Sequence, residues 1–386
     1  MYLKKFEELE KSGKPIRIGL VGLGAMGKGM AYNIHHTPGM ELVCVGDTDS
    51  KRYDELRAII PELQCWDAAD CMVVAESHNI DIFIEASSSI EMGLKYARKA
   101  IECGTDVLLM NGEVDCFYGP ELYKLAQEAG VMISSTDGDQ YGVLIKLLEE
   151  VELMRLRPIM IGNIKGFMNR YANPTNIKHE ADIRDLDYQM CVTYTDGTKL
   201  AIEMAIMSNA TGFVPYKGKM EGPDMKNVHE VVDYYDFDEI SKEPVVEYIV
   251  GAEPGGGVFI VAECHNDFQK GLLKYYKMGD GPYYVFYRPY HLCHIETAYA
   301  IGRMVFDKEP LLVPWKGRVA NINAVAKKNL NPGDILDEPG MYTVYGEMAL
   351  QSVIDENNWA LVHEVNGRKV KNPIKIDTPI CLDDLE

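Results

Sequence analysis

Short apolar runs alternate with longer amphipathic stretches over the first third of the chain. The runs are rich in Val, Ile and Leu, which is typical of strands buried on both faces of a sheet. The stretch EMGLKYARKAIECG (91–104) repeats apolar residues at helical spacing and stops at a glycine. This alternation predicts a parallel, doubly wound α/β domain over residues 14–140. Its predicted strands are IRIGLVG (16–22), ELVCVGD (41–47), DIFIEAS (81–87), TDVLLMN (105–111) and VMISST (131–136).

After Tyr141 the strict alternation is lost, and strands and helices follow one another irregularly. A helix is predicted over 141–156, and YQMCVTYTDGTKLAIEMAIMSNATG (188–212) predicts a strand, a turn and a helix. Another helix is predicted from about His291 to Phe306. This mixture predicts an α+β catalytic domain over 141–312. Its predicted strands are IMIGNIKGF (159–167), VVEYIVGA (245–252), GGGVFIVAEC (255–264) and YYVFY (283–287).

The C-terminal part contains short β-prone runs that are interrupted by Pro-Gly turns. They begin at about Val325, in the sequence VAKKNLNPGDILDEPGMYTVYGEM. A small β-rich domain with its tail is therefore predicted over 318–386.

A glycine-rich sequence, VGLGAMGKG, follows the first predicted strand and opens a helix. Its GxGxxG glycines are Gly22, Gly24 and Gly27, and Asp47 ends the second strand about twenty residues on. This context predicts a Rossmann dinucleotide-binding domain, in which a pyrophosphate lies at the helix N-terminus beside Ala25 and Met26. Asp47 would bind the ribose hydroxyls and favour NAD over NADP, although Lys51 and Arg52 lie close by. The alternative is a glycine-rich turn that binds nothing.

Two later strands end in small and polar residues. They supply Ser87, Asn111 and Glu113 at the carboxyl edge of the sheet, where cofactors lie in this kind of fold. These side chains are therefore candidates for contact with a nicotinamide ribose or a substrate, and the alternative is that they are ordinary loop residues.

Hydride transfer requires a group that stabilises negative charge on the carbonyl oxygen. Lys165 is predicted to lie in a glycine-flanked turn after a strand. Lys199 begins a predicted helix on which Glu203 lies one turn later, so that both can point into one pocket. A solvent-facing ion pair between these two residues is an equally good interpretation.

Further polar residues follow other predicted strands. Asp137 and Asp139 are candidates, with Glu203, for a divalent cation such as Mg²⁺ or Mn²⁺, but no residue set is assigned to a metal. Arg288 follows an apolar strand, where its guanidinium can clamp a phosphate or carboxylate. His291 is a candidate substrate or proton-transfer contact, and His294 follows at a spacing also found in metal sites and in structural histidine pairs.

Composition and charge narrow the possible partners. The chain has 59 acidic and 39 basic residues, a formal charge of −20, which argues against nucleic acid and anionic membranes. Nine scattered cysteines suggest reduced thiols, and neither a signal peptide nor a membrane span is predicted. We therefore expect a cytoplasmic protein with a small, anionic substrate.

With these residues in view, the chain resembles the homoserine-dehydrogenase-like oxidoreductases that include the second-type (reductoisomerase-like) 1-deoxy-D-xylulose 5-phosphate reductoisomerases. The C-terminal sequence AVAKKNLNPGDILDEPGMYTVYG resembles the small SAF (β-clip) domain. The matching stretches between residue 16 and about residue 312 are GLVGLGAMG, MNGEVD, GDQYG, GNIKG, DGTKLAIEMA, NATG, PGGGVFIVAE and KMGDGPYYVFYRPYHL.

The resemblance implies an NAD(P)-dependent oxidoreductase, a homodimer, with its active site between the nucleotide domain and the middle domain. A dehydrogenase or reductase of a sugar or polyol phosphate is the leading hypothesis. Reductoisomerase activity with an obligatory metal, homoserine dehydrogenase activity and a non-catalytic NAD(H) sensor are the alternatives. Asp47 favours NAD, whereas the reductoisomerases use NADPH. The resemblance implies pocket roles for Asn111, Glu113, Asp139, Lys165, Lys199, Glu203, Arg288 and His291.

Overall fold

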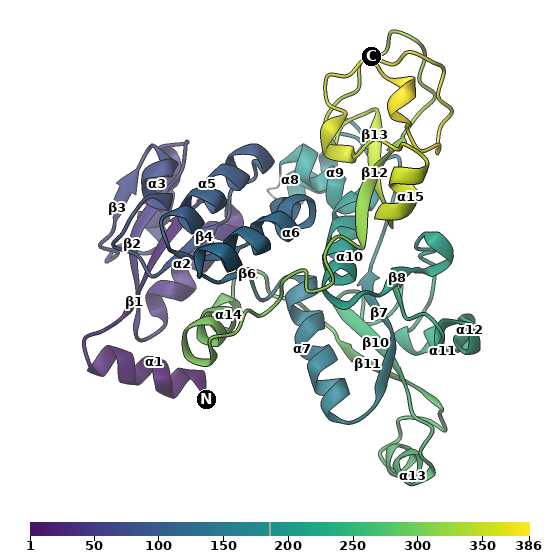
Figure 1. Ribbon diagram of the computed structural model, residues 1–386, viewed down its shortest axis with the longest axis horizontal. Helices are drawn as coiled ribbons and strands as arrows, with labels where there is room; N and C mark the ends of the chain where they lie inside the picture. The colour runs from purple at the N-terminus through teal and green to yellow at the C-terminus, as the bar shows by residue number, and fades with distance from the viewer. Residues whose placement is uncertain (185–186) are drawn as a thin grey trace. The chain divides into compact units, whose positions relative to one another are not determined.

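Six parallel strands form the first sheet of the computed structural model, which describes residues 1–184 and 187–386 (Figure 1). Their spatial order is β3-β2-β1-β4-β5-β6, the order of a dinucleotide-binding sheet. The predicted Rossmann-like α/β domain is therefore confirmed. The strands are β1 (Ile16–Val21), β2 (Met40–Gly46), β3 (Trp66–Ala68), β4 (Ile82–Glu85), β5 (Asp106–Leu109) and β6 (Ile133–Ser135).

Both faces of this sheet are covered by helices. Along β4, Ile82 and Ile84 belong to one buried cluster with α2 residues, and Phe83 belongs to the other with α5 residues. Burial on both faces explains why the strands are continuously apolar. The helices up to this point in the chain are α1 (Tyr2–Lys11), α2 (Ala25–His36), α3 (Lys51–Ile59), α4 (Cys71–Ala75), α5 (Ile90–Glu102) and α6 (Gly112–Ala129). The next helix, α7 (Gln140–Leu153), continues into the following part of the chain.

A late segment of the chain returns to this sheet. The helix predicted from His291 to Phe306 begins later, as α14 (Thr297–Gly302), and continues as a π-helical turn (Arg303–Asp307). Residues 291–296 are non-helical because they pack closely against glycines. A Cβ on Gly29 would lie 2.4 Å from the His294 ring, and Asn33 Nδ2 donates to the His294 carbonyl at 3.0 Å.

The second sheet is mixed, in the order β11-β10-β7-β9-β8. Here β10 is antiparallel to β7 and β11, whereas β9 is parallel to β7 and β8. This arrangement confirms the predicted α+β character. Its strands are β7 (Arg157–Lys165), β8 (Val214–Pro215), β9 (Val245–Val250), β10 (Val258–Glu263) and β11 (Tyr283–Arg288).

The strand predicted at the start of 188–212 is wrong, because these residues form α9 (Tyr188–Asp196). The Asp187 side chain accepts a hydrogen bond from Met190 N at 3.1 Å and caps the helix, which ends at Gly197 with a φ of +93°. The helix is stabilised by its N-cap, by the left-handed glycine at its C-terminus and by burial of Cys191 and Val192. Together these outweigh the β-propensity of the sequence. The other helices here are α8 (Lys178–Arg184), α10 (Thr198–Thr211), α11 (Val231–Tyr234), α12 (Phe237–Ile240) and α13 (Asp267–Tyr275).

The C-terminal residues form a small β structure built on α10. Strands β12 (Ala320–Ala326) and β13 (Val344–Leu350) pair antiparallel and are followed by α15 (Gln351–Glu356). Asn209 Oδ1 accepts from Val319 N at 2.8 Å and Ala320 N at 2.9 Å, and Thr198 Oγ1 accepts from Gly346 N. Polar side chains of a buried helix thus hold both strands.

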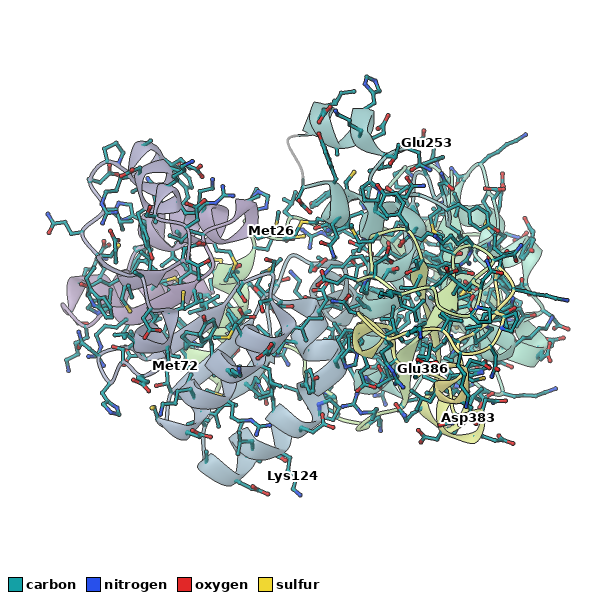
Figure 2. All side chains as sticks on the ribbon, turned by 90° about the horizontal axis from the view of Figure 1, so that it is seen from above. Met26, Met72, Lys124, Glu253, Asp383 and Glu386 are labelled. Atoms are coloured by element: carbon teal, nitrogen blue, oxygen red, sulfur yellow. The ribbon has the colours of Figure 1, made fainter. Side chains whose placement is uncertain are left out.

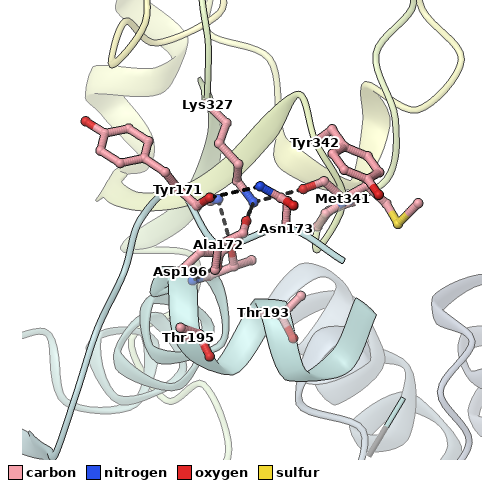
Figure 3. A network of polar contacts seen from close by, with 12 residues as sticks. Tyr171, Ala172, Asn173, Thr193, Thr195, Asp196, Lys327, Met341 and Tyr342 are labelled. Carbon is pink, nitrogen blue, oxygen red and sulfur yellow. Dashed lines mark hydrogen bonds and ion pairs between the residues drawn. The ribbon is translucent and has the colours of Figure 1, made fainter. Parts of the chain in front are cut away.

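A buried lysine joins the same two parts of the chain (Figure 3). Lys327 Nζ donates to Asp196 Oδ2 at 2.8 Å, to the Ala172 carbonyl at 2.9 Å and to the Met341 carbonyl at 3.1 Å. Burial raises the pKa of Asp196, and Lys327 opposes this rise. All three ammonium hydrogens are used, which identifies a structural ion pair.

The chain divides into two compact units. The first unit is Met1–Ile145 with His291–Trp315, and the second unit is Lys146–Tyr290 with Lys316–Glu386. Units of dense packing need not coincide with domains, so the boundaries 14–140, 141–312 and 318–386 stay predictions. In the described ranges, no helix is both long and apolar enough to cross a membrane.

We expect Lys327→Met to destabilise the protein by about 3–5 kcal/mol, because Asp196 would remain buried without its cation. Urea unfolding measures this loss. The double variant Lys327→Met/Asp196→Asn should recover part of it, and a double variant as unstable as the sum of the single variants would contradict the ion-pair interpretation.

Candidate functional site

The turn between β1 and α2 leaves no room for side chains at two of its glycines. A Cβ on Gly22, whose φ is +93°, would lie 2.3 Å from the Ala86 carbonyl oxygen. A Cβ on Gly27 would lie 1.8 Å from the Gly22 carbonyl oxygen. At Gly24, by contrast, an added Cβ meets no atom within 4 Å. The first and third glycines therefore serve packing, and the second faces open space at a helix N-terminus, where a phosphate fits.

Asp47 lies beside this turn, at the end of β2. Its Oδ2 accepts from Leu23 N at 2.6 Å, and its Oδ1 accepts from Asp49 N at 2.9 Å. A carboxylate has about four lone-pair sites, so ribose hydroxyls can still bind. Arg52, the nearby candidate for a 2′-phosphate, is paired with Glu55 at 3.0 Å and Asp49 at 3.8 Å. The preference for NAD over NADP stays a prediction.

Ala25 and Met26 form the first turn of α2, directly after Gly24. Met26 is labelled in Figure 2. Their backbone amides are among the first N–H groups of the helix, which have no partner within it. This position suits their predicted role at the pyrophosphate.

Glu85, at the end of β4, is a fully buried carboxyl at this edge of the sheet. Its Oε1 accepts from Ser87 N at 2.8 Å. Burial raises the pKa of Glu85 to about 7, although bonds from Ser87 and Asn111 oppose the rise. Glu85 therefore shapes the loop that carries Ser87.

Asn111 makes several structural hydrogen bonds. Its Oδ1 caps α6 by accepting from Val114 N at 3.2 Å, and its Nδ2 donates to the Ser87 carbonyl at 2.9 Å. Asn111 thus positions the 87–89 loop, and a direct cofactor contact stays a prediction. Glu113, in the first turn of α6, is half-buried.

Two predicted catalytic residues meet in the second unit. Lys165 is the last residue of β7, not part of a turn, and its Nζ lies 3.7 Å from Glu203 Oε2. Asn163 Nδ2 donates to the same oxygen at 3.1 Å. The Glu203 side chain is only 4% exposed, so the alternative of a solvent-facing pair between Lys199 and Glu203 is wrong. Lys199 lies one turn earlier on α10 and is half-buried.

Arg288 ends β11 in the second unit, as predicted. Its guanidinium lies over the Tyr290 ring, 4.5 Å from the centroid. Such stacking restricts the orientation of the guanidinium plane.

Asp139 and His291 lie close together in the first unit, joined by two neighbours. Gln140 Nε2 lies 3.2 Å from His291 Nε2, and Cys293 Sγ lies 3.4 Å from His291 Nδ1 and 3.7 Å from Asp139 Oδ1. His294 does not share a helix face with His291, because this segment is not helical.

Four residues of these clusters escaped the sequence analysis. Asn163 lies two residues before Lys165 on a strand, and this period of two places both on one face. Glu85 had a signal as well, since an acidic residue ends an otherwise apolar strand. Gln140 and Cys293 had none, because only the tertiary structure brings Gln140 to His291 and Cys293 to Asp139.

Comparisons with known proteins indicate the class of this chain. Residues 138–297 match the family model "Oxidoreductase DRL, catalytic domain". Homoserine dehydrogenase of Bacillus subtilis is 27% identical over 168 residues, and that of Neisseria gonorrhoeae is 26% identical over 168 residues. The match covers 40% and 42% of this chain but only 37% of each relative. The prediction of an enzyme is confirmed at the level of its class, oxidoreductase.

Solved structures were matched as well. A probable dehydrogenase from Thermotoga maritima is 14% identical, with a TM-score of 0.45, and the match covers 78% of this chain and 92% of that one. Biliverdin reductase from Synechocystis, in complex with biliverdin and NADP⁺, is 12% identical, with a TM-score of 0.46 and coverage of 78% and 93%.

The glycines of the turn allow a matched pair of variants. Gly24→Ala should leave the thermal midpoint close to that of the wild type but weaken NADH binding about tenfold or more, because the added methyl group enters the open space. Gly27→Ala should lower the midpoint itself, because its Cβ overlaps the Gly22 carbonyl. Calorimetry and NADH fluorescence measure both effects, and equal destabilisation by the two variants would contradict this division.

Glu85→Gln should change the pH dependence of stability. The raised pKa means that folded Glu85 holds its proton up to about pH 7, whereas unfolded Glu85 loses it at its lower, ordinary pKa. The wild type therefore loses unfolding free energy as the pH rises through this interval. Relative to the wild type, we expect the free energy of unfolding of Glu85→Gln to rise by about 2–3 kcal/mol between about pH 5 and pH 8. Urea titrations without cofactor measure this difference. The exposed control Glu102→Gln should follow the wild type.

Proposed function

We propose that the protein is an NAD(P)-dependent oxidoreductase that transfers a hydride to or from a small polyhydroxylated carbonyl compound, such as a sugar or polyol phosphate. The observation that carries this proposal is the glycine turn, with Gly22 and Gly27 closed by backbone and Gly24 facing open space. The strand order of the sheet and the match of residues 138–297 to an oxidoreductase catalytic domain support it.

The residues of the turn fit a dinucleotide, and NAD is favoured. Amides at the start of α2 would bind the pyrophosphate, and Asp47 would accept hydrogen bonds from the adenosine ribose. Ser87 and the loop that Asn111 holds would contact the nicotinamide half. A bound nicotinamide ring supplies or accepts the hydride.

Lys165 would stabilise the negative charge that develops on the substrate oxygen during reduction. Its Nζ lies 3.7 Å from Glu203 Oε2, so the carboxylate holds the end of the lysine side chain. Asn163 fixes the orientation of this carboxylate. The ammonium group can therefore donate a hydrogen bond, and a proton, to the reduced oxygen. Lys199, on the same helix as Glu203, is the second candidate for this role.

The remaining predicted residues would serve substrate binding. Arg288 would bind a phosphate or carboxylate with its N–H edges. His291 and Glu113 stay candidates for contact with the reacting end of the substrate.

The test is a screen for NADH and NADPH binding and oxidation with sugar, polyol and ketose phosphates, each with and without Mg²⁺ or Mn²⁺. We expect NADH to bind more tightly than NADPH and at least one ketose or aldose phosphate to be reduced. Failure of both cofactors to bind at millimolar concentration would overturn the proposal.

The same screen separates two rival activities. Strictly metal-dependent conversion of 1-deoxy-D-xylulose 5-phosphate would instead indicate a reductoisomerase, which the sequence resemblance suggests. Turnover of aspartate semialdehyde or homoserine would indicate a homoserine dehydrogenase, as in the two curated relatives. Cofactor binding without turnover on any compound would favour an NAD(H) sensor.

Lys165→Met should lower kcat by about 100–1,000-fold on the substrate found, because one donor to the developing charge is removed. NADH binding should not change. The exposed Lys219→Met is the matched control and should retain full activity. A variant Lys165→Met that keeps wild-type kcat would remove this residue from the mechanism.

A further inference from the structure

Three side chains with metal-binding atoms lie together in the first unit, outside the glycine turn. They are Asp139, His291 and Cys293, and their ligand atoms all lie within 4.8 Å of one another. Cys293 Sγ is 3.4 Å from His291 Nδ1 and 3.7 Å from Asp139 Oδ1. The three residues thus supply one sulfur, one nitrogen and one oxygen atom around a common point.

The backbone is built to bring these residues together. Gly138 has a φ of +86°, and a Cβ there would lie 2.4 Å from the Leu292 carbonyl oxygen and 3.0 Å from Cys293 Cα. The Asp137 side chain accepts from Gly138 N at 2.6 Å and fixes the turn. Residues 154 positions apart in the sequence are therefore held in contact by a position that admits only glycine.

The distances agree with those around a zinc ion. Zinc binds sulfur at about 2.3 Å and nitrogen or oxygen at about 2.0–2.2 Å, and a tetrahedral angle then separates sulfur from either atom by about 3.6 Å. The two distances from Cys293 Sγ match this value closely. Direct S–H hydrogen bonds span similar distances, so the types of ligand atom distinguish a metal site from a hydrogen-bonded cluster.

The donor set is that of zinc rather than magnesium. Mg²⁺ and Mn²⁺ prefer oxygen ligands, whereas thiolate with imidazole selects zinc and similar metals. Gln140 supplies the outer contact that metal-bound histidines usually have, since its side-chain amide lies 3.2 Å from His291 Nε2. A flip of the Gln140 side-chain amide exchanges its nitrogen and oxygen, so that His291 Nε2–H can donate to the oxygen. His291 Nδ1 then presents its lone pair to the metal.

We propose that Asp139, His291 and Cys293 form a binding site for a zinc-type divalent cation, with a fourth position open to water or a small ligand. The proposal goes beyond the proposed hydride transfer and does not depend on it. Cys293 is the distinguishing residue, because the other trio of possible ligands in the described part of the chain, His35, His36 and Glu62, contains no thiol.

The test is cobalt and zinc binding to the full-length protein after treatment with a chelator. We expect one equivalent of Co²⁺ to give thiolate-to-cobalt charge-transfer absorption and the intense visible bands of tetrahedral coordination. Zinc should displace the cobalt, and competition with a chromophoric chelator gives its affinity. Gln140→Ala should weaken zinc binding about 10–100-fold, and Cys293→Ser should weaken it more and abolish the charge-transfer band.

Two variants serve as matched controls. Cys103→Ser removes a thiol outside the cluster, and His35→Gln removes a ligand of the surface trio. Both should bind Co²⁺ like the wild type. If no charge-transfer band forms, or if it survives in Cys293→Ser, the three residues are only a hydrogen-bonded cluster and the proposal is wrong. Cys293→Ser changes one partly buried atom, so circular dichroism that matches the wild type excludes misfolding as the cause of a loss.

Discussion

The backbone between Gly22 and Gly27 can take its path only because neither residue has a side chain. Gly22 packs against the Ala86 carbonyl after β4, and Gly27 packs against Gly22 itself. Asp47, after β2, binds the same turn through Leu23 N. The carboxyl ends of β1, β2 and β4 are thereby tied to the start of α2. Glu85 and Asn111 lie at the same edge of the sheet, at the carboxyl ends of β4 and β5.

The second unit is organised around a buried helix instead of a glycine turn. Thr198 and Asn209, near the two ends of α10, hold the backbone of β12 and β13, while Glu203 between them binds Asn163 and approaches Lys165. One helix thus joins the C-terminal strands to the candidate catalytic lysine. The small β structure is consequently part of the support of the site.

Two lysine–carboxylate pairs in the second unit differ in burial and in hydrogen bonding. Lys327 uses all its hydrogens on Asp196 and two carbonyl groups and is only 3% exposed. Lys165 lies at a strand end, is 15% exposed, and is 3.7 Å from Glu203. The first pair has no capacity for a ligand, because every donor is satisfied within the protein. The second pair is longer and more exposed, and it is the pair to which the proposed function assigns a catalytic role.

The sequence by itself determined the parallel sheet, the glycine turn, and the places of Asp47 and Arg288 at strand ends. These features follow from local patterns, namely apolar runs, glycine spacing and polar residues after strands. The tertiary structure decided that 188–196 is helical, since burial of Cys191 and Val192 in one cluster with residues of preceding segments outweighs local β-propensity. It also decided that Cys293 meets Asp139 and that Glu203 is buried, because such contacts join residues far apart in sequence, and no local pattern encodes them.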